Sequence, residues 1–208
     1  MHPRDGDLIV ASHGRSLWIA DDITPLQQLT PAVLGQDVVL FESRPAVLWA
    51  TDRRESQQIG GQKVFVGANP PRGTAISYYL KTAATGEVKI SVLDASGRAL
   101  CTSTGASDAG INRVQWTLVA PLLAGQGAAG RGGFGGGGGG GGGRGGLGAL
   151  DTSCSPANAG RGGGFGGGFG GGFGGGVTPG EYTVKLTVGG RDYTKAVTVL
   201  EDRWLNDR

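Results

Sequence analysis

The sequence predicts an all-β protein whose main part is a two-sheet antiparallel sandwich of about seven strands. Short segments with alternating apolar and polar residues recur along the chain, and glycine-containing turns separate them. Outside one glycine-rich stretch, no segment shows the long 3.6-residue period of a helix. A sheet with one buried and one solvated face explains this alternation.

The chain begins with a predicted β-hairpin within residues 1–23. Residues 7–12 and 15–20 are short apolar runs, and His13-Gly14 forms the turn between them. A two-stranded hairpin alone is marginal in water, so we expect it to pack on something else. We interpret Met1 as lying only a few residues before the final strands of a larger unit.

Residues 24–37 are predicted to be a linker with a short helical turn. Thr24 can cap this turn, Pro25 suits its first position, and Gln27 can complete a capping box. The Thr30-Pro31 pair is expected to begin another turn.

The sandwich is assigned to residues 38–124 together with residues 177–202, and residues 203–208 form a tail. Val88, Ile90 and Val92 alternate with polar residues, and the segment from Tyr182 to Val188 has the same pattern. Asp94-Ala95-Ser96-Gly97 and Gly189-Gly190 are typical of hairpin turns. The predicted strands are 38–41, 47–50, 63–66, 75–81, 87–93, 98–102, 112–118, 180–188 and 192–200.

Residues 125–176 form a glycine-rich, low-complexity insert that contains 30 of the 44 glycines. We expect the insert to be disordered, because glycine loses the most backbone freedom on ordering. Replacing the insert by a short turn is then expected to raise stability slightly. The three arginines and one aspartate of the insert account for the whole net charge of +2. The body is therefore neutral, and we do not expect it to bind nucleic acid or a membrane surface.

The chain has two cysteines, Cys101 and Cys154, and they do not form a disulfide framework. Cys154 lies inside the predicted disordered insert. We therefore expect two unpaired thiols, with a Cys101–Cys154 bridge left open.

Residues 2–26 read HPRDGDLIVASHGRSLWIADDITPL, and this stretch resembles the closing propeller segment of bacterial BNR-repeat, sortilin-like "glycosyl hydrolase" proteins. Gly6 stands where that family commonly has Asn, and Ser12 where it has Thr. The segments FESRP (41–45), GANPP (67–71) and AISYYL (75–80) are similar to the region that follows in the family. The segments VKISVLD (88–94), GINRVQW (110–116) and PGEYTV (179–184) resemble the Ig-like, fibronectin-III-like domain of flagellar hook-capping proteins.

The resemblance implies that residues 1–23 are the remnant of a last propeller blade, with the propeller itself as the partner upstream. It also implies an extracytoplasmic parent protein, although this chain carries no signal peptide. We expect a non-catalytic accessory sandwich that contacts protein or glycan. One alternative is a part of a propeller glycoside hydrolase with its active site upstream. A second is a Gly/Arg-rich nucleic-acid or self-association module.

The residues predict no catalytic, cofactor or metal site. The only histidines are His2 and His13, and His13 is interpreted as a turn residue. Asp21 and Asp22 are adjacent on an extended segment, so they cannot flank one bond, and we expect them to end the hairpin. Of the aromatic residues, Tyr78, Tyr79 and Trp49 are candidate surface-binding residues, although aromatics in alternating strands are more often core. Since Tyr78 and Tyr79 are neighbours, one is expected to face inward and the other outward.

Overall fold

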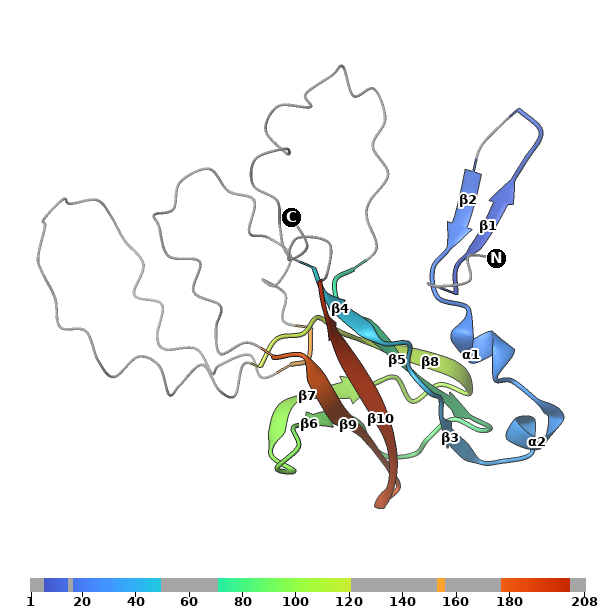
Figure 1. The fold of residues 1–208 in the computed structure, drawn as a ribbon. Coiled ribbons are helices and arrows are strands. Elements are labelled where there is room, and N and C mark those ends of the chain that lie inside the picture. The colour runs from blue at the N-terminus through green and yellow to red at the C-terminus, as the bar shows by residue number, and fades with distance from the viewer. Residues whose placement is uncertain (1–5, 15–16, 50–70, 121–152, 156–176, 203–208) are drawn as a thin grey trace, which may run out of the picture.

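The computed structural model describes residues 6–14, 17–49, 71–120, 153–155 and 177–202 (Figure 1). These residues confirm a predominantly β fold with two short helices. The predicted strand 63–66 and the tail 203–208 lie outside the described residues, as does all of the insert except Ser153–Ser155. The elements are β1 (Leu8–Ala11), β2 (Leu17–Ala20), α1 (Thr24–Gln27), α2 (Pro31–Leu34), β3 (Val38–Leu40), β4 (Ala46–Leu48), β5 (Thr74–Leu80), β6 (Val88–Leu93), β7 (Ala99–Gly105), β8 (Gly110–Trp116), β9 (Gly180–Val188) and β10 (Arg191–Glu201).

Strands β3 to β10 form two sheets, which we call the two-sheet body. One sheet has the order β4-β10-β9-β6-β7 and the other the order β3-β5-β8. Both sheets contribute side chains to one hydrophobic core. The hairpin β1-β2 is a separate two-stranded sheet that projects away from the body (Figure 1).

One strand pair departs from the predicted antiparallel arrangement. Strand β4 runs parallel to β10, with Ala46 opposite Val199. The reason is the link of residues 41–45, which carries the chain from the three-stranded sheet to the edge of the five-stranded sheet. A strand that enters an edge by such a crossing is not forced to be antiparallel, as it would be after a tight hairpin turn.

The body's core follows the predicted alternation. Val88, Ile90 and Val92 of β6 are buried, and Tyr182, Val184 and Leu186 of β9 are buried beside them. Ser91, on the opposite face of β6, is buried as well, and its hydroxyl is hydrogen-bonded there to the Thr102 hydroxyl (3.1 Å). Trp116 of β8 packs edge-on against Tyr182 at a centroid distance of 5.5 Å, which joins the two sheets at the centre of the core.

The expectation of two unpaired thiols is wrong, because Cys101 and Cys154 form a disulfide with a Cα–Cα distance of 5.0 Å. Both cysteines are fully buried. The Cys154 amide donates to the Ser103 hydroxyl of β7 (2.8 Å), and the Thr117 amide after β8 donates to the Cys154 carbonyl (3.0 Å). Residue 154 therefore bridges the edge strands of the two sheets. At this position the insert is part of the folded body and cannot be replaced without losing the disulfide.

The short helices also differ from the predicted capping. Thr24 does not cap α1, because its hydroxyl donates instead to the Asp22 carboxylate (2.5 Å). Thr30 caps α2 by accepting a hydrogen bond from the Val33 amide (3.3 Å), with Pro31 in the first turn. The predicted cap chemistry is present in this linker, but it occurs one turn later.

Candidate functional site

The predicted aromatic candidates lie in different environments. Tyr78 is fully buried in the core, and its hydroxyl donates to the Ala106 carbonyl (2.5 Å). Burial and the nearby Asp108 carboxylate raise the pKa of Tyr78 to about 12. Tyr79 is half-buried on the opposite face of β5, so the expected division into an inward and an outward tyrosine is confirmed.

Trp49 is 47% exposed and follows β4 at the edge of the five-stranded sheet. Tyr79 lies in the central strand of the other sheet, opposite Val39 and Ile111. The outward aromatic residues thus lie on different sheets, and Trp116 belongs to the core. Tyr79 and Trp49 do not share a strand pair that would build one stacking platform.

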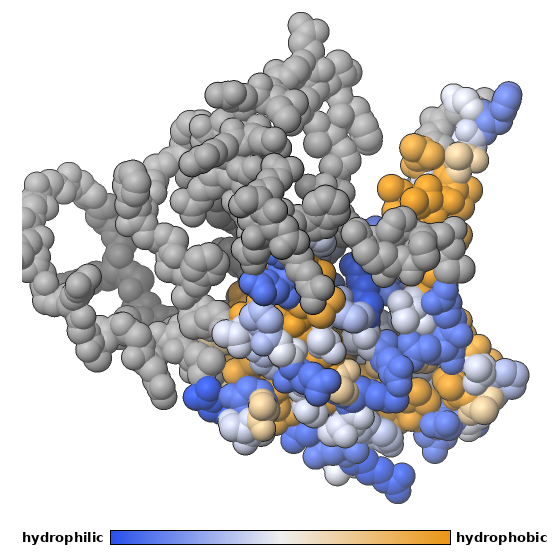
Figure 2. All heavy atoms as spheres, viewed as in Figure 1, coloured by the Kyte–Doolittle hydropathy of each residue, from blue (hydrophilic) through white to orange (hydrophobic). Residues whose placement is uncertain are grey.

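The hairpin carries more than half of the exposed large apolar side chains in the part of the chain that the structure describes. Its six large apolar residues are between 40% and 68% exposed: Leu8, Ile9, Val10, Leu17, Trp18 and Ile19. They appear in Figure 2 as an apolar surface on the projecting hairpin. The turn residue His13 at its tip is exposed.

Both faces of the hairpin are apolar. Directly opposite residues in an antiparallel pair share a face. Val10 lies opposite Trp18 on one face, and Ile9 lies opposite Ile19 on the other. Strands with continuous apolar sequence are typical of positions covered on both sides. The hairpin thus has the composition of an internal sheet element, although it lies in solvent here.

The root of the hairpin is fixed to the body by polar contacts. Asp22 is buried with a positive φ of 53°, and its amide donates to the Asp7 carboxylate (3.0 Å). The Asp22 carboxylate accepts from the Thr24 amide (3.3 Å) and lies 3.8 Å from an Arg113 nitrogen of β8. Arg44, between β3 and β4, lies 3.7 Å from the Asp7 carboxylate. These contacts agree with the predicted role of Asp22 in ending the hairpin.

A second anchor lies in the linker. The Gln28 side chain accepts a hydrogen bond from the Glu42 amide (2.9 Å) and donates to the Glu42 carbonyl (3.0 Å). This reciprocal pair ties the residue after α1 to the segment that crosses between the sheets. The hairpin root is therefore held at two places, whereas its strands beyond the root are exposed.

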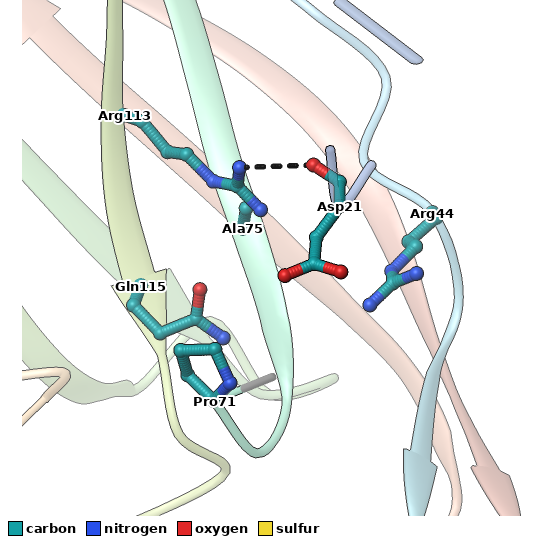
Figure 3. A pocket seen from close by; sticks show the side chains of 6 residues that line it. All are labelled: Asp21, Arg44, Pro71, Ala75, Arg113 and Gln115. Carbon is teal, nitrogen blue, oxygen red and sulfur yellow. Dashed lines mark hydrogen bonds between the residues drawn. The ribbon is translucent and has the colours of Figure 1, made fainter. Parts of the chain in front are cut away.

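A small pocket of about 150 Å³ opens at the hairpin root (Figure 3). Asp21 enters it from the end of β2, and the guanidinium groups of Arg44 and Arg113 border it. The Arg113 side chain also donates to the Asp21 carbonyl (3.4 Å). The lining residues are Asp21, Arg44, Pro71, Ala75, Arg113 and Gln115. Sequence reasoning missed this pocket because its residues come from four separate segments and form no motif.

The described residues contain no group of three or more His, Cys, Asp or Glu side chains that could hold a metal ion. In the described part of the chain, neither helix has the length and apolar character needed to cross a membrane. The glycine-rich stretch with Arg131, Arg144 and Arg161 lies outside the described residues, so the nucleic-acid alternative stays a prediction.

No protein-family model matches the sequence, and no curated protein or solved structure matches it either.

Proposed function

We propose that this chain is a non-catalytic accessory module in which an Ig-like β-sandwich is joined to a secreted β-propeller through the N-terminal hairpin. The observation that carries the proposal is the hairpin, whose two apolar faces are exposed while its root is fixed to the body. The partner that suits such an element is a β-structure that covers both faces, as neighbouring strands and blades do in a propeller.

The size of the exposed surface supports a docking role. Burying a large apolar side chain fully contributes about 1.5–3 kcal/mol. Six such residues that are about half exposed leave roughly 5–10 kcal/mol to be gained on burial. Association of separate molecules costs about 4–15 kcal/mol in lost freedom. A partner in the same polypeptide avoids most of that cost, and this favours a propeller joined covalently to the hairpin.

Two features of the body support the Ig-like assignment. Trp116 lies buried at the centre between the sheets, where Ig domains also place a tryptophan. The Tyr182 hydroxyl, near the start of β9, donates to the Thr178 carbonyl four residues upstream (2.7 Å). This contact has the form of the tyrosine corner of Ig sandwiches. The parallel β4–β10 pair and a disulfide that includes a residue of the insert distinguish this body from an antibody domain.

The buried Cys101–Cys154 disulfide supports an extracytoplasmic location. Disulfides form and persist in secreted and periplasmic proteins, whereas the cytosol keeps thiols reduced. Because both sulfurs lie in the core and residue 154 bridges two edge strands, this disulfide has a structural role.

Strand complementation tests the proposal. The chain is mixed with a BNR-type propeller from which the closing two-stranded segment has been removed, so that main-chain hydrogen bonds to the open sheet edges add to the apolar contact. Binding is measured by calorimetry. We expect a 1:1 complex, and we expect Trp18→Ser to weaken it at least about tenfold, since this change removes a large apolar contact. Leu26→Ser is the matched control, because Leu26 is 60% exposed but lies on α1.

An equal loss of binding in the Trp18→Ser and Leu26→Ser variants would contradict a specific role of the hairpin. The absence of any complex with several such propellers would contradict the propeller as partner. Thermal unfolding of each variant checks that the body is intact.

A further inference from the structure

The Asp21 carboxylate is the most unusual group of the pocket at the hairpin root. It is half-buried and points into the space between Arg44 and Gln115 (Figure 3). Within the described part of the chain, no hydrogen bond or ion pair joins this carboxylate to another residue. A carboxylate beside two guanidinium groups normally pairs with one of them. Here neither guanidinium forms an ion pair with the Asp21 carboxylate, although both border the same pocket (Figure 3).

Each arginine contacts a different aspartate. Arg113 lies 3.8 Å from the Asp22 carboxylate, and Arg44 lies 3.7 Å from the Asp7 carboxylate. Both distances are long for a charge-assisted hydrogen bond, which spans about 2.7–2.9 Å. A guanidinium has five N–H donors, so each of these groups can also donate to a ligand.

Gln115 adds an acceptor to this arrangement. Its side-chain nitrogen donates to the Arg72 carbonyl (2.8 Å), which fixes the amide and leaves the side-chain oxygen as an acceptor at the pocket. Pro71 and Ala75 supply the apolar part of the lining. The pocket thus combines donors from Arg44 and Arg113, acceptors from Asp21 and Gln115, and a small apolar wall.

The charges around the pocket select the class of ligand. Two guanidinium groups are accompanied by three carboxylates, those of Asp7, Asp21 and Asp22. An anion in the pocket would be repelled by the Asp21 carboxylate, and a cation would be repelled by both arginines. Neither kind of ion is therefore attracted by all the charged groups around the pocket. A hydroxyl group can donate to a carboxylate and accept from a guanidinium. Two adjacent hydroxyl groups satisfy both sides of the pocket together.

We propose that this pocket binds the vicinal hydroxyl groups of a neutral saccharide, with Asp21 as acceptor and Arg113 and Arg44 as donors. The C–H groups of the sugar ring would lie against Pro71 and Ala75. A volume of about 150 Å³ equals that of about five liquid waters, which suits a single ring. Since none of the described residues that line the pocket is aromatic, we expect a Kd in the millimolar range for a ligand of about a dozen heavy atoms.

Titration of the full chain, followed by backbone amide NMR, tests the proposal. The probes are methyl α-D-glucopyranoside, trans-1,2-cyclohexanediol, cyclohexanol and sodium sulfate. We expect saturable shifts at the amides of Asp21, Arg113 and Gln115 with the glucoside and the diol. Cyclohexanol has a single hydroxyl and should bind at least about tenfold more weakly, since a hydrogen bond to a charged group is lost.

Variants separate the pocket from other surfaces. Asp21→Ala should abolish the shifts, and Asp21→Asn should weaken binding because it keeps an acceptor oxygen but loses the charge. The matched control is Asp192→Asn, which changes an exposed aspartate of β10 that pairs with Lys185 of β9. This variant should bind both diol probes as the unchanged chain does.

Three results would overturn the proposal. The first is sulfate that saturates the same amides at lower concentration than the glucoside, with tighter binding in Asp21→Asn, which would identify an anion site. The second is unchanged diol binding in Asp21→Ala while its thermal unfolding matches the parent. The third is the absence of shifts with either diol probe at about tenfold the expected millimolar Kd.

Discussion

The hairpin and the two-sheet body use the same kinds of residue, yet they bury them to opposite extents. Trp116 of β8 has no exposed surface, whereas Trp18 of β2 is 68% exposed. In the body, strands such as β6 and β9 turn an apolar face toward the core and a more polar face outward, and the central strand β5 is covered on both faces. In the hairpin, both faces are apolar and neither is covered by the described residues. The body thus buries its apolar residues in a core of its own, whereas the hairpin leaves its apolar residues exposed on both faces.

The largest expected effect comes from the two tryptophans. Trp116→Ala should lower the free energy of unfolding by about 3–5 kcal/mol, because it leaves a cavity between the sheets. Trp18→Ala should change it by less than about 0.5 kcal/mol, as expected for an exposed site. Urea unfolding followed by the fluorescence of the remaining tryptophans measures both. Similar losses in the two variants would mean that the hairpin is part of the body's cooperative unit.

Two glycines with positive φ, one in the body and one in the hairpin, should respond differently to substitution by alanine. Gly73 has a φ of 88°, and a Cβ there would lie 1.9 Å from the Trp116 carbonyl oxygen. Gly14, in the hairpin turn, has a φ of 70° but no atom within 4 Å of such a Cβ. Gly73→Ala should cost about 2–5 kcal/mol, from backbone strain and overpacking together. Gly14→Ala should cost about 1–2 kcal/mol within the hairpin alone and leave the melting temperature of the body unchanged.

Removal of the disulfide should also affect the body. Cys101→Ser with Cys154→Ser should lower the free energy of unfolding by about 2–4 kcal/mol, since the bridge closes a loop with a sequence separation of 53. Thermal melts with and without reductant provide the control, because reductant should not change the double variant. Replacement of residues 125–176 by a short turn removes Cys154 and should now destabilise the chain. If the shortened chain were instead more stable, the disulfide would not stabilise the body, and the expectation that the insert can be replaced without loss would be correct.

The sequence predicted the features that local pattern controls. Strands β6 and β9 were recognisable because their alternation matches a sheet with one buried face. The hairpin was recognisable from two apolar runs around His13-Gly14, and the expectation that it packs on a partner, drawn from its small size, stays a prediction. The division into one inward and one outward tyrosine followed from Tyr78 and Tyr79 being neighbours, and the structure shows that Tyr78 is the inward one.

The remaining features depend on contacts between distant segments. The burial of Cys154 depends on hydrogen bonds to β7 and to the segment after β8, which lie far from it in the sequence. The glycine-rich residues around Cys154 therefore give no local sign that it enters the core. The parallel β4–β10 pair depends on the crossing at residues 41–45. The pocket depends on Asp21 meeting Arg44, Arg113 and Gln115, which lie far from it in sequence.

Native-state hydrogen exchange on the isolated full chain tests most directly whether the hairpin lacks its partner. A two-stranded ribbon is marginally stable in water, while core strands open only with global unfolding. We expect amides of β1 and β2, such as those of Ile9 and Ile19, to exchange orders of magnitude faster than those of β6 and β9. Protection of the hairpin amides equal to that of Ile90 and Val184 would show that the hairpin is already a stable part of the body and lacks no partner.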